Sequence, residues 1–300
     1  MSETTGSIRL PCHWCGIAGI KPTSGRVPRT GDILAFSVGA LDSWAQVGPM
    51  ARYVEDLALT LAVIAGVDWR DPAIVPMPLG DPQTIELKNL RCAAYTDNGL
   101  AFTTSDIANA VNAAAKAMAD VGASVQEACP RGVDRTYEIF GHVVSGDGRA
   151  WTRRLLEKSG TAAAETAPHL SQMLSLSQSS PTGEFTAWLE QMDAVRSEML
   201  SFMASYDVIL CPVHPIPAHP HGQRLLPNAA VTMESWRKAI SHTYAYNLVG
   251  WPGAVVRVGT SQEGLPIGVQ IVARPWREDV ALAVAQHIET VFGGWQQPSL

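Results

Sequence analysis

The stretch LRCAAYTDNGLAFTTSDIANAVNAAAKAMADVGASVQEA, residues 90–128, indicates the fold class. Residues 90–95 form a short apolar run that is typical of a buried strand. Residues 103–121 predict a helix, because apolar side chains recur on one face and Gly122 follows as a stop. Residues 124–128 predict a second strand. A strand, a helix and a strand in this order favour a right-handed parallel crossover.

The rest of the chain extends this pattern. Runs rich in β-branched residues, bounded by Gly and Pro, predict buried strands at 207–211, 254–258 and 267–272. Helices are predicted at 53–65 and 278–292, and two long helical patterns, 134–156 and 185–203, form a helical excursion at about residues 134–204. Residues 1–52 are rich in Gly and Pro and predict loops around a site. We expect a single domain over residues 1–300, an α/β fold with a mixed, largely parallel β-sheet covered by helices on both faces.

Composition excludes several classes of function. The 300 residues are 46% hydrophobic and carry a net charge of -6, and no basic stripe appears, so we expect no nucleic-acid partner. The longest apolar stretch, around residues 57–67, is too short to span a bilayer, so no membrane association is expected. The first residues lack a signal-peptide pattern, and five scattered cysteines do not suggest a disulfide framework. These features predict a cytoplasmic protein.

A candidate nucleophile loop lies at residues 3–9. Gly6 permits a positive φ and a close approach of backbone N–H groups to a ligand. Successive N–H groups in such a loop bind an anion, which is what the oxyanion of acyl transfer requires. Glu3 and Arg9 can join the two limbs of the loop through a salt bridge and so position Ser7. Taken alone, Thr5-Gly6-Ser7 is also compatible with an ordinary N-terminal turn.

The longer pattern Gly-Ser-Ile-Arg-x-Pro-x-x-x-Cys-Gly-x-x-Gly-x-Lys-Pro-Thr-x-Gly-Arg, residues 6–26, resembles the nucleophile segment of the amidase signature family of serine hydrolases. Residues 46–58, 206–212, 247–254 and 264–270 are similar to further motifs of that family, in family order. The resemblance runs from residue 4 to about residue 289. It implies an amidase-signature-like α/β/α sandwich and no metal or organic cofactor.

The resemblance also implies a reaction. Ser7 would attack a small-molecule carboxamide, and the acyl-serine intermediate would then be hydrolysed. The backbone N–H groups of Thr4, Thr5, Gly6 and Ser7 would form the oxyanion hole, with Glu3 and Arg9 as the positioning pair. The resemblance places the loop that contains His214 near the acyl pocket, and Trp151 and Trp188 of the helical excursion are further candidates for its lining.

Members of the family carry a Ser–cis-Ser–Lys triad whose lysine and bridging serine precede the nucleophile. Only six residues precede Ser7, and all five lysines follow it. We therefore expect the N-terminal elements of the family to be missing and the nucleophile to be poorly activated. The leading function is an impaired amidase. The alternatives are a ligand-binding or split-enzyme half, completed by an N-terminal fragment, and an A-type amidotransferase subunit. A homodimer is a further possibility.

Three other patterns carry weaker signals. Cys12 and Cys15 have the spacing of a redox or metal pair, but no second ligand pair accompanies them. A Pro-rich loop holds His214, His219 and His221 without an acidic ligand, so a rigid rim loop is favoured over a metal site. Residues 235–238 fit Ser-x-x-Lys without the companion motifs of penicillin-recognising enzymes, which indicates coincidence on an amphipathic helix.

Overall fold

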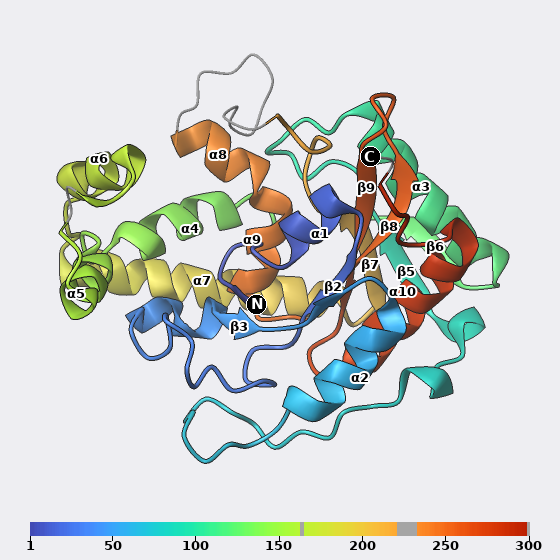
Figure 1. The fold of residues 1–300 in the computed structure, drawn as a ribbon, viewed down its shortest axis with the longest axis horizontal. Helices are drawn as coiled ribbons and strands as arrows, with labels where there is room; N and C mark the ends of the chain where they lie inside the picture. The colour runs from blue at the N-terminus through green and yellow to red at the C-terminus, as the bar shows by residue number, and fades with distance from the viewer. Residues whose placement is uncertain (163–164, 221–232, 299–300) are drawn as a thin grey trace.

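The structure, a computed structural model, describes residues 1–162, 165–220 and 233–298 (Figure 1). In these residues one sheet of seven strands has the order β4-β2-β8-β9-β7-β5-β6, and β1 pairs separately with β3. The strands are β1 (Ser2–Glu3), β2 (Ala18–Lys21), β3 (Gln46–Val47), β4 (Met50–Ala51), β5 (Arg91–Ala94), β6 (Ser124–Glu127), β7 (Val208–Pro212), β8 (Gly253–Thr260) and β9 (Pro266–Ala273).

The helices surround this sheet. They are α1 (Arg9–Cys15), α2 (Val54–Ile64), α3 (Ser105–Asp120), α4 (Thr136–Ser145), α5 (Ala150–Ser159), α6 (Pro168–Leu176), α7 (Thr182–Phe202), α8 (Met233–Ala239), α9 (Ser241–Leu248) and α10 (Glu278–Phe292). Short 3-10 helices are η1 (Gly39–Trp44), η2 (Pro82–Thr84) and η3 (Leu87–Asn89). The helices predicted at 53–65, 103–121 and 278–292 are confirmed as α2, α3 and α10.

Side chains of the central strands alternate between two hydrophobic cores. On β7, Val208 and Leu210 belong to the first core, and Ile209 and Cys211 belong to the second. Residues of α2, α3 and α10 complete the first core, whereas residues of α1, α4, α7 and α9 complete the second. The alternation follows from the two-residue period of side chains along a strand. A mixed sheet with helices on both faces, an α/β/α sandwich, is therefore confirmed.

The expectation that the sheet is largely parallel is wrong. β5 pairs in parallel with β6 and β7, which confirms the crossover predicted over residues 90–128. The other four ladders of this sheet, β2–β4, β2–β8, β7–β9 and β8–β9, are antiparallel. Only residues 261–265 join β8 to β9, which is too short for a parallel connection. Apolar β-branched runs predict the existence of strands and not their direction.

The residues between β6 and β7 form the helical excursion of α4 to α7. The single helix predicted over 134–156 is two helices, because Gly148 and Arg149 both adopt φ 63° between α4 and α5. Helix α7 contains nearly all of the segment predicted at 185–203 and begins at Thr182. Helix α6 was not predicted. Figure 1 shows α5 and α6 at the end of the excursion that lies away from the sheet.

Residues 1–52 are more ordered than the loops predicted there. Helix α1 and strand β2 both lie in this range, and the side chains of Ile8 and Ile20 are fully buried. Helix α1 has only seven residues, too few to show a helical period in the sequence. Its Pro11 lies in the first turn, where N–H groups have no intrahelical acceptor, so proline is tolerated. The Gly and Pro content of this segment therefore predicted loops where a helix and a strand of the core lie.

Gly48→Ala is expected to destabilise the sheet beside β2. A Cβ at residue 48 would overlap the carbonyl oxygen of Ile20, and such overpacking costs about 1–3 kcal/mol. Gly259→Ala is the matched control, because a Cβ at residue 259 meets no atom within 4 Å. Urea unfolding measures both variants, and equal midpoints would contradict the packing described for β2.

Candidate active site

The candidate nucleophile loop lies between β1 and α1. Glu3 pairs with Gln46 across the β1–β3 ladder, and the chain then turns so that the N–H of Leu10 donates to the carbonyl of Gly6 at 2.7 Å. Gly6 has φ 133°, and a Cβ there would lie 2.7 Å from Oγ1 of Thr243. Both the backbone conformation and the close approach of α9 therefore require glycine at this position.

A fully buried ion pair holds the two limbs of this loop together. Nε of Arg9 donates to Oε1 of Glu3 at 2.9 Å, and Nη2 of Arg9 contacts the same oxygen. The second carboxylate oxygen of Glu3 accepts the backbone N–H groups of Ile8 at 2.9 Å and Arg9 at 3.1 Å. Both oxygens of the Glu3 carboxylate thereby accept hydrogen bonds. These bonds fix the backbone before and after Ser7 relative to the carboxylate.

Arg9 also joins the loop to distant parts of the chain. Its Nη2 donates to the carbonyl of Thr243 at 2.9 Å and to Oδ1 of Asn247, and its Nη1 donates to Oε1 of Gln270. Oγ1 of Thr243 donates to the carbonyl of Thr5 at 2.6 Å. Nε2 of Gln270 donates to the carbonyl of His242 at 2.9 Å. Helix α9 and strand β9 thus position the loop through one guanidinium.

Lys21 lies in the same buried region. Its side chain is fully buried, and Nζ donates to the carbonyl of Pro22 at 3.0 Å. Burial, assisted by the charge of Arg9, lowers the pKa of Lys21 to about 7. Burial alone would raise the pKa of Glu3, but Arg9 and Lys21 outweigh it and lower that pKa. The charges of Glu3, Arg9 and Lys21 are therefore coupled beneath the loop.

Ser7 lies on the outer surface of the loop, and its residue is exposed. In the part of the chain that the structure describes, the N–H groups of Thr5, Gly6 and Ser7 have no hydrogen-bond acceptor. No lysine, histidine or carboxylate within the described ranges forms a hydrogen bond with the Ser7 hydroxyl. The arrangement supplies a hydroxyl and free backbone donors side by side, and leaves the hydroxyl without a base.

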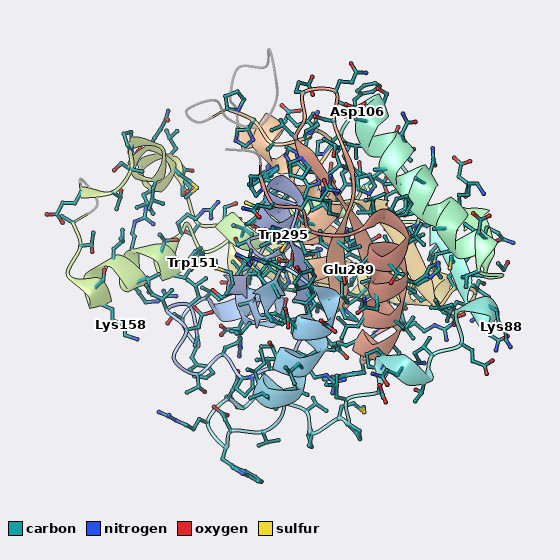
Figure 2. The ribbon with its side chains drawn as sticks, turned by 45° about the vertical axis from the view of Figure 1, so that its right-hand side comes forward. Lys88, Asp106, Trp151, Lys158, Glu289 and Trp295 are labelled. Atoms are coloured by element: carbon teal, nitrogen blue, oxygen red, sulfur yellow. The ribbon has the colours of Figure 1, made fainter. Side chains whose placement is uncertain are left out.

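The three candidates for the acyl pocket lie on other segments than the nucleophile loop. His214 is fully buried beside the Trp14 ring, at 5.6 Å between centroids, and burial lowers the pKa of His214 to about 3. Trp188 stacks on His142, at 3.9 Å between centroids. Trp151 lies on α5, and Figure 2 shows it on the side of the molecule opposite Lys88 and Asp106. Contact of these side chains with a substrate stays a prediction.

Neither of two cavities in the structure includes Ser7. One, of about 430 Å³, lies between α3 and α10, and the other, of about 320 Å³, lies between α5 and the segment around Phe36.

Residues 1–162, 165–220 and 233–298 contain no group of three His, Cys, Asp or Glu side chains that fits a metal ion. His221, in the Pro-rich loop that also holds His214 and His219, lies outside these residues. No helix among them is long and apolar enough to cross a membrane.

Sequence reasoning found Glu3, Arg9 and the loop between them, and missed the residues that hold Arg9. Thr243, Asn247 and Gln270 each contact its guanidinium. Asn247 and Gln270 stand within segments similar to family motifs, which is a signal that they serve the same site as Ser7. Thr243 carries no such signal, because a single threonine outside these motifs indicates no function. The buried Lys21 was also assigned no role at the site.

Glu3→Gln is expected to destabilise the protein by about 3–5 kcal/mol, because Arg9 would remain buried without a counter-charge. Glu86→Gln is the control, since Glu86 and Lys88 form an exposed pair at 3.7 Å whose loss costs less than about 1 kcal/mol. Urea unfolding at neutral pH measures both. Equal losses of stability would show that the buried pair does not fix the loop.

The lowered pKa of Lys21 predicts that the free energy of unfolding rises with pH. Its pKa is about 7 in the folded chain and 10.5 ordinarily, so between these values the unfolded chain binds more protons than the folded chain. The free energy of unfolding should therefore increase from pH 7 to pH 10. Lys21→Met should remove this component of the rise, whereas Lys88→Met, at an exposed site, should keep it. Denaturant unfolding across this range would refute the coupling if Lys21→Met left the slope unchanged.

Sequence relatives identify the family. A family model described as Amidase matches residues 2–282. Fatty-acid amide hydrolase 2-B of Danio rerio is 30% identical, over 100% of this chain and 58% of its own length. The A-type subunit of glutamyl-tRNA(Gln) amidotransferase from Roseiflexus sp. (strain RS-1) is 31% identical, over 97% of this chain and 62% of its own. The chain spans about three-fifths of the length of these curated relatives.

Solved structures share the fold. A 6-aminohexanoate cyclic dimer hydrolase complexed with substrate superposes with a TM-score of 0.80 at 24% identity, over 97% of this chain and 64% of that one. A fatty acid amide hydrolase gives a TM-score of 0.77 at 22% identity, over 98% of this chain and 56% of that one. With the family model matching residues 2–282, the chain belongs to the amidase family.

Proposed function

We propose that this chain provides the nucleophile and oxyanion-binding half of an amidase that cleaves carboxamides through an acyl-serine intermediate. Ser7 is the nucleophile, and the N–H groups of Thr4, Thr5, Gly6 and Ser7 stabilise the oxyanion. The observation that carries the proposal is the exposed Ser7 hydroxyl beside backbone N–H groups that have no acceptor within the described residues. Donors already aimed at the developing charge need no reorganisation during the reaction.

The buried pair beneath the loop supports this assignment. Glu3 accepts the N–H groups of Ile8 and Arg9, and Thr243 donates to the carbonyl of Thr5. These contacts fix the peptide groups on both sides of Gly6 and Ser7 without occupying the donors of Gly6 and Ser7. Glu3 and Arg9 are positioning residues, since they act on substrate only through the loop. Such support is what a preorganised site requires.

The proton acceptor for Ser7 is the part of the mechanism that the described residues do not supply. Lys21 is buried and donates to Pro22, and His214 is buried and hydrogen-bonded to Ile216. A serine hydroxyl needs an adjacent base to become an efficient nucleophile. We propose that a lysine and a bridging serine in a second polypeptide segment, of the kind that precedes the nucleophile in the family, complete the site.

A complementation assay tests this function. The chain alone should hydrolyse nitrophenyl esters and primary amides poorly. A fragment with an upstream lysine and a Gly/Ser-rich loop should increase the rate by about 10²-fold or more, since general-base catalysis contributes that much. Ser7→Ala should abolish the gain, whereas Ser197→Ala, at an exposed position on α7, should keep it. Undiminished turnover by Ser7→Ala would exclude Ser7 as the nucleophile.

A second function is favoured by one comparison. The chain is as similar to the A-type subunit of a glutamyl-tRNA(Gln) amidotransferase as to a fatty-acid amide hydrolase, at 31% and 30% identity. In that role it would release ammonia from glutamine and pass it to a partner protein. Ammonia release from glutamine, compared with release from alkyl and aryl amides by the complemented chain, separates the two functions.

A further inference from the structure

The peptide group between Thr5 and Gly6 is held by helix α9. Its carbonyl oxygen accepts a hydrogen bond from Oγ1 of Thr243 at 2.6 Å. A trans peptide group directs its C=O and its N–H to opposite sides. The N–H of Gly6 therefore points away from α9, and it has no acceptor in the part of the chain that the structure describes. In this orientation Gly6 is free to donate to an oxyanion.

The next peptide group is oriented by a local contact instead. The carbonyl of Gly6 accepts the N–H of Leu10 at 2.7 Å, where the chain enters α1. The N–H of Ser7 belongs to this peptide group, so it points away from Leu10. The two donors thus depend on different contacts. Ser7 depends on a bond within its own segment, and Gly6 depends on Thr243, which is 238 residues from Thr5.

Gly6 alone does not select the orientation of its N–H. Its φ is 133°, and glycine adopts positive and negative φ about equally readily. Rotating the Thr5–Gly6 peptide group by half a turn changes only the ψ of Thr5 and the φ of Gly6. The carbonyl oxygen of Thr5 would then lie where the N–H lies now, and it would repel an oxyanion. A contact from outside the loop must therefore hold this peptide group in place.

Thr243 meets the requirements for that contact. Its side chain is fully buried on α9, and its hydroxyl also reaches the carbonyl of Ile240 at 2.9 Å, which fixes the position of Oγ1. The backbone carbonyl of Thr243 accepts Nη2 of Arg9 at 2.9 Å. One residue therefore contacts the chain before Ser7 through its side chain and the chain after Ser7 through its main chain. Within the described ranges, no other group donates a hydrogen bond to the carbonyl of Thr5.

We propose that Thr243 is a positioning residue of the oxyanion hole. Its hydroxyl holds the Thr5–Gly6 peptide group so that the N–H of Gly6 is directed at the developing charge, and removal of the hydroxyl allows the peptide group to turn over. Thr243 acts on substrate only through the loop. This inference rests on the proposed function for the role of the loop, and it adds the residue on which one of the donors depends.

Nuclear magnetic resonance of the chain tests the orientation without turnover. In the parent and in Thr243→Ser, which keeps the hydroxyl, the backbone amide of Gly6 should give one signal without exchange between conformations. Thr243→Val keeps the shape of the side chain and removes the hydroxyl. Its Gly6 signal should shift and show relaxation dispersion, which reports motion on the microsecond-to-millisecond timescale. An unchanged Gly6 signal in Thr243→Val, or exchange in the parent, would overturn the proposal.

Turnover by the complemented chain tests the catalytic consequence. Thr243→Val should lower kcat by about 10²-fold and leave KM nearly unchanged, because an oxyanion-hole donor acts in the transition state. Thr243→Ser should keep most of the activity. Thr60→Val is the matched control, because Oγ1 of Thr60 donates to the carbonyl of Asp56 at 2.7 Å on an exposed part of α2.

Equal kcat values for Thr243→Val and Thr60→Val would show that the Thr243 hydroxyl serves only its own helix. Thermal unfolding confirms that each variant is folded at the assay temperature. If valine is not accepted at this buried position, Thr243→Ala takes its place in both measurements with the same expected results, because alanine also lacks the hydroxyl and cannot clash.

The positioning role and the proposed function fail separately. If the Gly6 signal responds to Thr243→Val and Ser7→Ala leaves turnover unchanged, Thr243 orients the peptide group and the nucleophile assignment fails. If Ser7→Ala abolishes turnover while Thr243→Val keeps both the Gly6 signal and kcat, the nucleophile assignment stands and the positioning role fails.

Discussion

The buried ion pair between Glu3 and Arg9 determines the geometry of the candidate site. Two charges without solvent contact are stable only where geometry and hydrogen bonds compensate for lost hydration. Here every part of the compensation is present: Glu3 accepts from Arg9 and from two backbone N–H groups, and Arg9 donates to Thr243, Asn247 and Gln270. Because these partners come from several elements, moving any one of them would leave a buried charge unsatisfied.

This constraint explains why the loop can hold backbone donors that have no acceptor within the described residues. Fixing the peptide groups around Ser7 loses conformational entropy, and the ion pair with its partners compensates for that loss. Gly6 completes the arrangement, because its φ of 133° and its close approach to Thr243 exclude a side chain. The donors of Gly6 and Ser7 stay unpaired within the described residues, while the groups beneath them are saturated. A loop that buried contacts hold rigid, and whose backbone N–H groups stay unpaired, favours the binding of an oxyanion.

The sequence alone determined the local features of this protein. Periodicity, turn residues and a family resemblance can all be recognised over short stretches of sequence. They predicted the crossover over residues 90–128, helices α2 and α10, the strands β7, β8 and β9, and the loop with Gly6 and Ser7. The tertiary structure decided the direction of β8 and β9, the break between α4 and α5 at Arg149, and the hydrogen bond between Arg9 and Gln270, which are 261 residues apart. Pairing between distant segments depends on which surfaces are buried together, and a local pattern of apolar residues carries no record of its partner.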